Sequence, residues 1–156
     1  MNRNIHLLFV LCFLSFILHS CTKDTVYNRY VAIENRTWDK NSEYFFNFTI
    51  TDNVIPYDIS LNLRNNNMYP FKNLWLFYDI KLPDGSLIND TLEAILANDF
   101  GKWTGKGISI YHNEFPLQTN YHFPDTGHYT IVFRQGMRNN VLQGIENIGL
   151  MIKKSK

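Results

Sequence analysis

The sequence predicts an all-β protein: an antiparallel β-sandwich of immunoglobulin-like architecture with about seven or eight strands. Three observations lead to this prediction. Aromatic residues make up 15% of the chain, asparagine is abundant and alanine is scarce, a composition that favours strands and turns over helices. Apolar and polar residues alternate with a period of two in several segments. Glycine, proline and asparagine punctuate the chain between those segments.

The alternation is clearest over residues 43–51, where Tyr44, Phe46, Phe48 and Ile50 share one face of an expected strand. Period-two patterns or short apolar runs predict further strands over residues 59–64, 74–82, 87–91, 117–123, 128–135 and 148–153. Residues 92–97 are the one segment for which we expect a helical turn. The following residues, 98–107, contain three glycines and are expected to form a loop.

Two turns have a clear chemical basis. Pro83-Asp84-Gly85 follows the strand expected at 74–82, and proline and glycine there suit a tight turn. The second turn, residues 124–127, leads into Asp125-Thr126-Gly127-His128-Tyr129, which has the form of a tyrosine corner. The alternative is a turn followed by an ordinary core tyrosine. Because the paired core cysteines of antibody domains are absent, the immunoglobulin likeness concerns the sandwich architecture only.

The N-terminus predicts export and lipid attachment. Arg3 precedes an apolar run over residues 7–18, which is too short to span a bilayer comfortably and has the proportions of a signal-peptide core. Leu18-His19-Ser20-Cys21 resembles a bacterial lipobox, in which the cysteine is acylated and becomes the first residue of the mature chain. The alternative is an ordinary signal peptide with an incidental cysteine. Acyl chains on Cys21 would give a stable membrane anchor.

These features divide the chain into three expected regions. Residues 1–20 form a lipoprotein signal peptide, residues 21–42 form the lipidated N-terminus with a tether and a first short strand, and residues 43–156 form the β-sandwich domain. The other cysteine, Cys12, lies in the removed segment. The mature chain therefore has no partner for a disulfide and no thiolate cluster for a metal.

Charge and motifs argue against several functions. Removal of Arg3 with the leader leaves fourteen basic and fourteen acidic side chains, so the mature chain lacks the positive excess typical of nucleic-acid binding. His122 and His128 flank the 124–127 turn and could be neighbours across a hairpin, but two histidines make a weak metal site. Residues 101–107 lack the spacing of a phosphate-binding loop. We expect no catalytic residues, no metal, no cofactor and no enzymatic activity.

The best candidate for a recognition surface combines asparagine amides with aromatic rings. It comprises Asn65, Asn66, Asn67, Tyr69 and Trp75, residue types that bind proteins or carbohydrates. The alternative is structural: the asparagines make a turn, and the strand of Trp75 and Phe77 is central and covered on both faces. Exposure or burial of Trp75 distinguishes these interpretations.

Segments along nearly the whole chain resemble the GldH-type gliding-motility lipoproteins of Bacteroidetes. The resemblance is carried by residues 61–67, 69–70, 73–76, 82–85, 90–93, 101–107, 123–124, 127–129, 135–138, 142–145 and 148–150. It implies a non-enzymatic lipoprotein of the gliding apparatus, which is coupled to type IX secretion, with Cys21 as the lipidated residue.

The resemblance also implies a membrane partner through the lipid, protein partners in the gliding or secretion machinery, and a location in the cell envelope, at the outer membrane. Whether the protein faces the periplasm or the cell surface is left open. The alternative function is that of a carbohydrate-binding envelope lipoprotein.

Overall fold

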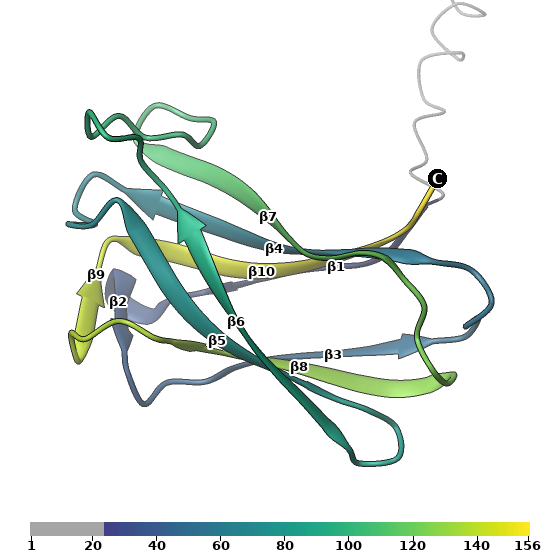
Figure 1. Ribbon diagram of the computed structural model, residues 1–156. Coiled ribbons are helices and arrows are strands. Elements are labelled where there is room, and N and C mark those ends of the chain that lie inside the picture. Colours follow the sequence, from purple (N-terminus) through teal and green to yellow (C-terminus); the bar gives the residue numbers. More distant parts are fainter. Residues whose placement is uncertain (1–23) are drawn as a thin grey trace, which may run out of the picture.

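The computed structural model describes residues 24–156, so the expected signal peptide and Cys21 lie outside the described residues. This part of the chain contains ten strands and one short 3₁₀ helix (Figure 1). In chain order the elements are β1 (Thr25–Ala32), η2 (Glu34–Arg36), β2 (Thr37–Asp39), β3 (Tyr44–Ile50), β4 (Tyr57–Asn66), β5 (Asn73–Lys81), β6 (Leu87–Ile95), β7 (Ile110–Tyr121), β8 (Gly127–Gln135), β9 (Val141–Gln143) and β10 (Ile145–Lys154). Within residues 24–156, no helix has the length and apolar character needed to cross a membrane.

Eight strands form two four-stranded sheets that face each other, which confirms the predicted antiparallel β-sandwich. One sheet has the order β1-β10-β4-β7 and the other has the order β3-β8-β5-β6 (Figure 1). All neighbours within each sheet are antiparallel. The two remaining strands, β2 and β9, pair with each other at one end of the sandwich.

Most connections cross from one sheet to the other. β5 and β6 are the exception, because they pair as a hairpin. The turn predicted at Pro83-Asp84-Gly85 joins them: Gly85 donates a 3.0 Å hydrogen bond to the Leu82 carbonyl, with a φ of 87° that favours glycine. The resulting strand order is that of a jelly roll, so the likeness to immunoglobulin domains is limited to the layered architecture and the corner described below.

The predicted alternation sets the inner face of each strand. Phe46, Phe48 and Ile50 of β3 are buried, whereas Phe45, directly before Phe46, is 50% exposed. Inner residues of β4, β5, β8 and β10 complete the apolar layer: Ile59, Leu61, Leu63, Leu74, Leu76, Tyr78, Ile80, Tyr129, Ile131, Phe133, Ile148, Leu150 and Ile152. Trp38 of β2 is fully buried and packs edge-on against Tyr44 at 5.1 Å, which closes the end of the core near β9.

The tyrosine corner is confirmed. The Tyr129 hydroxyl donates a 2.7 Å hydrogen bond to the carbonyl of Asp125, four residues upstream. The ring of Tyr129 is buried and stacks on Phe48, with centroids 5.7 Å apart and an interplanar angle of 11°. The corner therefore ties the loop between β7 and β8 to the core.

The helical turn expected at residues 92–97 is wrong. β6 continues to Ile95 and pairs along its whole length with β5, so that Leu92 lies opposite Leu76. Ala94 is fully buried while Ile95 is 44% exposed, which is the period of a strand. A helix of six residues would have been marginal, whereas the β5 ladder satisfies the backbone of this segment.

The 124–127 turn does not form the hairpin across which His122 and His128 could have been neighbours. β7 pairs with β4 and β8 pairs with β3 and β5, so the chain passes from one sheet to the other at this turn. His122 and His128 are consequently not cross-strand neighbours. β7 begins at Ile110, earlier than the expected strand at 117–123, and β2 and β9 had no counterpart in the sequence prediction.

Two buried hydroxyls should respond oppositely to removal. Tyr129→Phe removes the corner hydrogen bond and leaves the Asp125 carbonyl without that donor, so we expect a loss of about 1–2 kcal/mol in the free energy of unfolding. Tyr27→Phe is the matched control, because the Tyr27 hydroxyl is buried without a partner among the described residues. It should leave stability unchanged or raise it. Denaturant unfolding of the unlipidated chain measures both, and equal losses would contradict the assignment of the corner.

Candidate functional site

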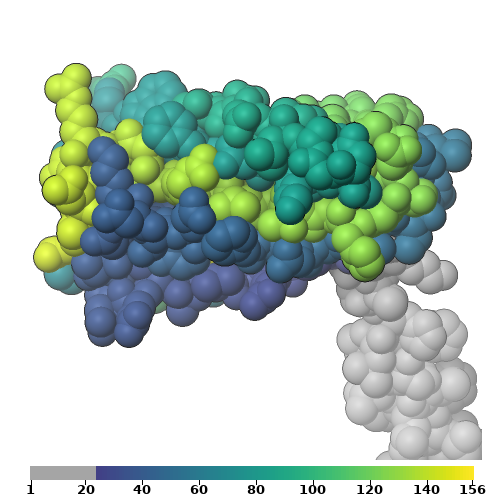
Figure 2. All heavy atoms as spheres, turned by 90° about the horizontal axis from the view of Figure 1, so that it is seen from below, coloured from purple at the N-terminus to yellow at the C-terminus, as the bar shows by residue number. Residues whose placement is uncertain are grey.

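The outer face of the sheet β3-β8-β5-β6 carries large apolar side chains in contact with solvent. Phe45, Trp75 and Phe77 are 50%, 40% and 46% exposed, and Val132 is partly exposed beside them. We call these four residues the aromatic face. Figure 2 views the molecule from this side, with blue β3, yellow-green β8 and teal β5 and β6 as neighbouring bands. Exposed apolar groups gathered on one face mark interaction sites.

The strand period explains how the aromatic face arises. Trp75 and Phe77 alternate with the buried Leu74 and Leu76 on β5, so both aromatic rings point away from the core. The sequence-based alternative, in which both faces of this central strand are covered, is wrong, because no second layer within residues 24–156 packs on the outer side. Phe77 lies over Gly136, where a Cβ atom would come within 3.1 Å of its ring.

Cross-strand register brings the third aromatic residue to the same face. Phe45 of β3 lies opposite Val132 of β8, and Val132 lies opposite Asp79 of β5. Met137, which packs against the core from the loop after β8, accepts a 3.3 Å hydrogen bond from the Trp75 backbone N–H through its sulfur and so fixes the end of β5. The face is therefore built from three chain segments that are distant in sequence.

Charged groups cross the aromatic face. Arg134 of β8 lies between two carboxylates, with Nη1 3.1 Å from Glu43 Oε1 and Nη2 2.5 Å from Asp79 Oδ2. Asn89 of β6 donates a further hydrogen bond to Asp79. Aromatic residues and arginine are enriched in protein interfaces relative to the rest of the surface, and this face combines them.

The structure places most of the predicted asparagine surface inside the molecule. Asn65 is fully buried, and its Oδ1 accepts a 3.1 Å hydrogen bond from Asn113 Nδ2. Asn66 is 9% exposed and donates a 2.6 Å hydrogen bond to Glu146. These two amides hold the end of the β4 strand rather than facing solvent.

The other three predicted residues divide between core and surface. Tyr69 is buried and donates a 2.8 Å hydrogen bond to the Asn73 carbonyl, and burial raises the pKa of its hydroxyl. Asn67 is exposed, and its Oδ1 accepts a 2.9 Å hydrogen bond from the indole N–H of Trp103. Trp75 lies on the aromatic face. The sequence therefore placed Trp75 and Phe77 together on one strand face, and missed Phe45 and Val132 as their partners.

A polar cluster lies on the outer face of the other sheet. His112 Nε2 is 3.0 Å from the Tyr30 hydroxyl and 3.2 Å from Asn62 Oδ1. The Arg64 guanidinium lies 4.4 Å from the centroid of the Tyr30 ring, a cation–π contact. Burial lowers the pKa of His112, and the positive charge of Arg64 lowers it further.

The remaining histidines do not form a site with one another. His128 Nδ1 lies 2.9 Å from Thr49 Oγ1, and His122 is exposed after β7. Among residues 24–156, no group of three or more histidine, cysteine, aspartate or glutamate side chains is arranged to hold a metal ion.

The His112 cluster predicts a pH dependence of stability. In the unfolded chain His112 has its ordinary pKa, near 6.5, whereas in the native state its pKa is lower. The unfolded chain therefore binds a proton at His112 more readily than the native state does. The free energy of unfolding should therefore fall as the pH drops below about 6.5. His112→Gln should make this fall shallower, whereas the exposed control His122→Gln should keep the wild-type profile. Denaturant unfolding between pH 5 and about 8 measures the slopes, and indistinguishable slopes for His112→Gln and wild type would contradict this role.

Solved structures similar to the chain are β-sandwiches of low sequence identity. They include a carbohydrate-binding module specific for non-crystalline cellulose, with a TM-score of 0.41 and 10% identity, covering 81% of this chain and 70% of that one. A family 35 carbohydrate-binding module from Clostridium thermocellum has a TM-score of 0.32 and 12% identity, covering 82% of this chain and 99% of that one. No ligand is transferred from these likenesses.

Sequence relatives give a specific result. A protein of Christiangramia forsetii, the gliding motility lipoprotein GldH homolog, is 34% identical over 161 aligned positions that cover 98% of both chains. The gliding motility lipoprotein GldH of Flavobacterium johnsoniae is 31% identical over 152 positions, covering 92% of this chain and 94% of that one. The family model described as GldH lipoprotein matches residues 25–152. The chain belongs to the GldH lipoprotein family.

Proposed function

We propose that this protein is a non-enzymatic component of the gliding-motility and type IX secretion-associated machinery, anchored to the outer membrane through Cys21. Membership of the GldH lipoprotein family supports the lipid anchor and the envelope location. The aromatic face supports the second half of the proposal: the protein acts by holding a protein partner against the outer side of the β3-β8-β5-β6 sheet.

The exposure of Trp75 and Phe77 is the observation that carries this proposal. Both rings lie in the middle of a sheet whose strands already pair with their neighbours. The two side chains therefore contribute neither to the apolar core nor to strand pairing. Large aromatic side chains and arginine dominate the energetics of protein interfaces. The Glu43–Arg134–Asp79 ion pairs supply the polar groups that select one partner over another.

Carbohydrate binding is the second candidate, and the same exposure of Trp75 favours it. We place it second because the asparagines that would have accompanied Trp75 are directed elsewhere. Asn65 and Asn66 are committed to Asn113 and Glu146, and Asn67 contacts Trp103.

The lipid anchor is tested by fractionation in the native host. Cys21→Ala should leave the outer-membrane fraction, because the acyl chains that hold the protein there can no longer be attached. Cys12→Ala is the matched control, since Cys12 belongs to the segment expected to be removed, and it should fractionate as wild type. A Cys21→Ala protein that stays in the outer membrane would overturn the assignment of the anchor.

The partner is tested by affinity isolation from detergent-solubilised membranes. Trp75→Ala combined with Phe77→Ala should lower the recovery of gliding or secretion components by about tenfold or more, the size of a hot-spot loss, without moving the protein from the membrane. Met68→Ala with Ile108→Ala removes two other exposed apolar side chains and should leave recovery unchanged. Unchanged recovery with the first pair would contradict docking at the aromatic face. Envelope polysaccharide recovered in place of proteins, and lost with the first pair, would establish the second candidate.

A further inference from the structure

The start of β1 and the end of β10 lie together at one end of the sandwich (Figure 1). Thr25 pairs with Lys153, and the Lys154 backbone N–H donates a 2.8 Å hydrogen bond to the Asp24 carbonyl. Cys21 precedes Asp24 by three residues, so the two Cα atoms are at most about 11 Å apart. A lipid anchor on Cys21 therefore brings this end of the sandwich, rather than the opposite end, close to the membrane surface.

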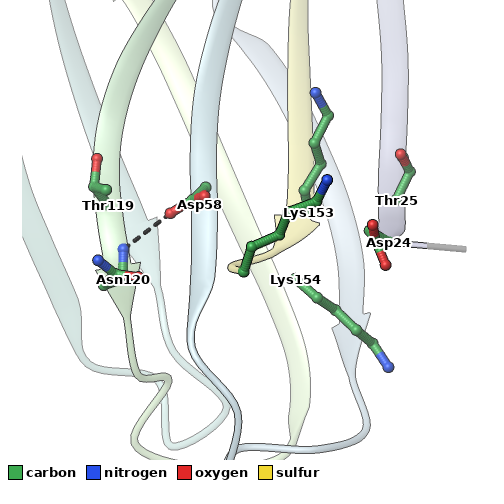
Figure 3. Close-up of a pocket in the computed structure, with 8 residues that line it drawn as sticks. Asp24, Thr25, Asp58, Thr119, Asn120, Lys153 and Lys154 are labelled. Atoms are coloured by element: carbon green, nitrogen blue, oxygen red, sulfur yellow. Dashed lines mark hydrogen bonds between the residues drawn. The ribbon is translucent and has the colours of Figure 1, made fainter. Parts of the chain in front are cut away.

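An open groove of about 500 Å³ lies at this anchored end. Lys153, Lys154 and Lys156 line it together with the polar side chains of Thr119 and Asn120 (Figure 3). Within residues 24–156 none of these three lysines takes part in an ion pair. Their ammonium groups are available to an anion from outside.

Two carboxylates also line the groove, and one of them is already occupied. Asp58 accepts a 3.0 Å hydrogen bond from the Asn120 backbone N–H (Figure 3) and a 2.7 Å hydrogen bond from the Ser155 hydroxyl. These donors lower the pKa of Asp58 and occupy acceptor positions on its ionised carboxylate. Asp24 is the second carboxylate, so three lysine side chains face two carboxylates, one of which already accepts hydrogen bonds from its own partners.

An exposed apolar tip lies at the same end. The loop between β3 and β4 is tied to the chain after β10 by a 3.0 Å hydrogen bond from the Ser155 backbone N–H to the Pro56 carbonyl. Val54 of this loop is 81% exposed. Lysines beside an exposed apolar side chain form the combination that binds a membrane interface, with charges at the headgroups and the apolar group at the acyl boundary.

We infer that the anchored end is a membrane-docking surface, in which Lys153, Lys154 and Lys156 bind the phosphates of anionic lipid headgroups and Val54 enters the interface. The occupant is the bilayer that carries the Cys21 acyl chains, so the inference rests on the proposed lipid anchor but not on the proposed partner. Docking orients the sandwich: the aromatic face stands to the side, free of the membrane, and the loops around β2 and β9 point away from it.

The test uses the lipidated mature protein in vesicles, with an environment-sensitive fluorophore on Val54→Cys. The label enters at that position alone, because Cys12 is removed and the Cys21 thiol is acylated. In phosphatidylglycerol-containing vesicles we expect blue-shifted emission that is quenched by lipid-borne quenchers. In phosphatidylcholine vesicles the emission should be that of water. A label at Ile108→Cys, which is 90% exposed at the opposite end, should report water in both.

The lysines are tested by substitution in the labelled protein. Each lysine replaced by glutamine should lower the docked-to-undocked ratio about fivefold in anionic vesicles, and 0.5 M salt should have a similar effect on the wild type, because the Debye length falls to about 4 Å. The control variant replaces Lys40, Lys102 and Lys106 together by glutamine. It removes the same three positive charges from the end of the sandwich opposite the groove, and it should leave docking intact. Because the acyl chains hold every variant on the vesicle, loss of docking cannot be confused with loss of anchoring. Water-like emission of the wild type in anionic vesicles, or docking that survives replacement of all three groove lysines, would overturn the inference.

Discussion

Phe48, Phe123 and Tyr129 pack against one another where the chain passes from β7 to β8, and this contact at the crossover between the two sheets underlies the rest of the structure. The ring of Phe123 lies 4.8 Å from that of Tyr129, which stacks in turn on Phe48. Because β7 and β8 belong to different sheets, the corner bonded by the Tyr129 hydroxyl sets how one sheet sits on the other. The inner faces then close over a continuous apolar core, and the alternate residues of each strand are directed outward.

The outward-directed residues differ between the two sheets. On β1-β10-β4-β7, Tyr30 contacts His112 through a 3.0 Å hydrogen bond and Arg64 through a cation–π contact. On β3-β8-β5-β6, no layer within residues 24–156 covers Trp75 and Phe77. The proposed function depends on this difference: a sandwich anchored at one end would present the aromatic face laterally, toward a neighbouring envelope protein.

The sequence predicts the inner residues of β3, β4, β5 and β8 because period-two alternation reports burial directly. It fails at residues 92–97, where an apolar run of helix-forming residues is stabilised as strand by its distant partner β5. It also misses β2 and β9, which are three residues each and pair only through the closed fold. Phe45 and Phe77 could not be assigned to a surface, because exposure depends on whether a second layer covers the sheet. The sequence suggests Asn65 and Tyr69 as surface residues because it does not report their exposure. In the folded chain both are buried near the end of β4.

Site-specific photo-crosslinking in living cells tests the central claim most directly. A photoreactive amino acid at position 77 lies in the aromatic face, and one at position 28 lies at an exposed site on β1 of the other sheet. The account predicts that irradiation joins the variant labelled at position 77 to one envelope protein of defined mass, and that the variant labelled at position 28 gives no such adduct. The absence of any protein adduct from position 77, or the same adduct from both positions, would contradict the claim that this face holds a partner.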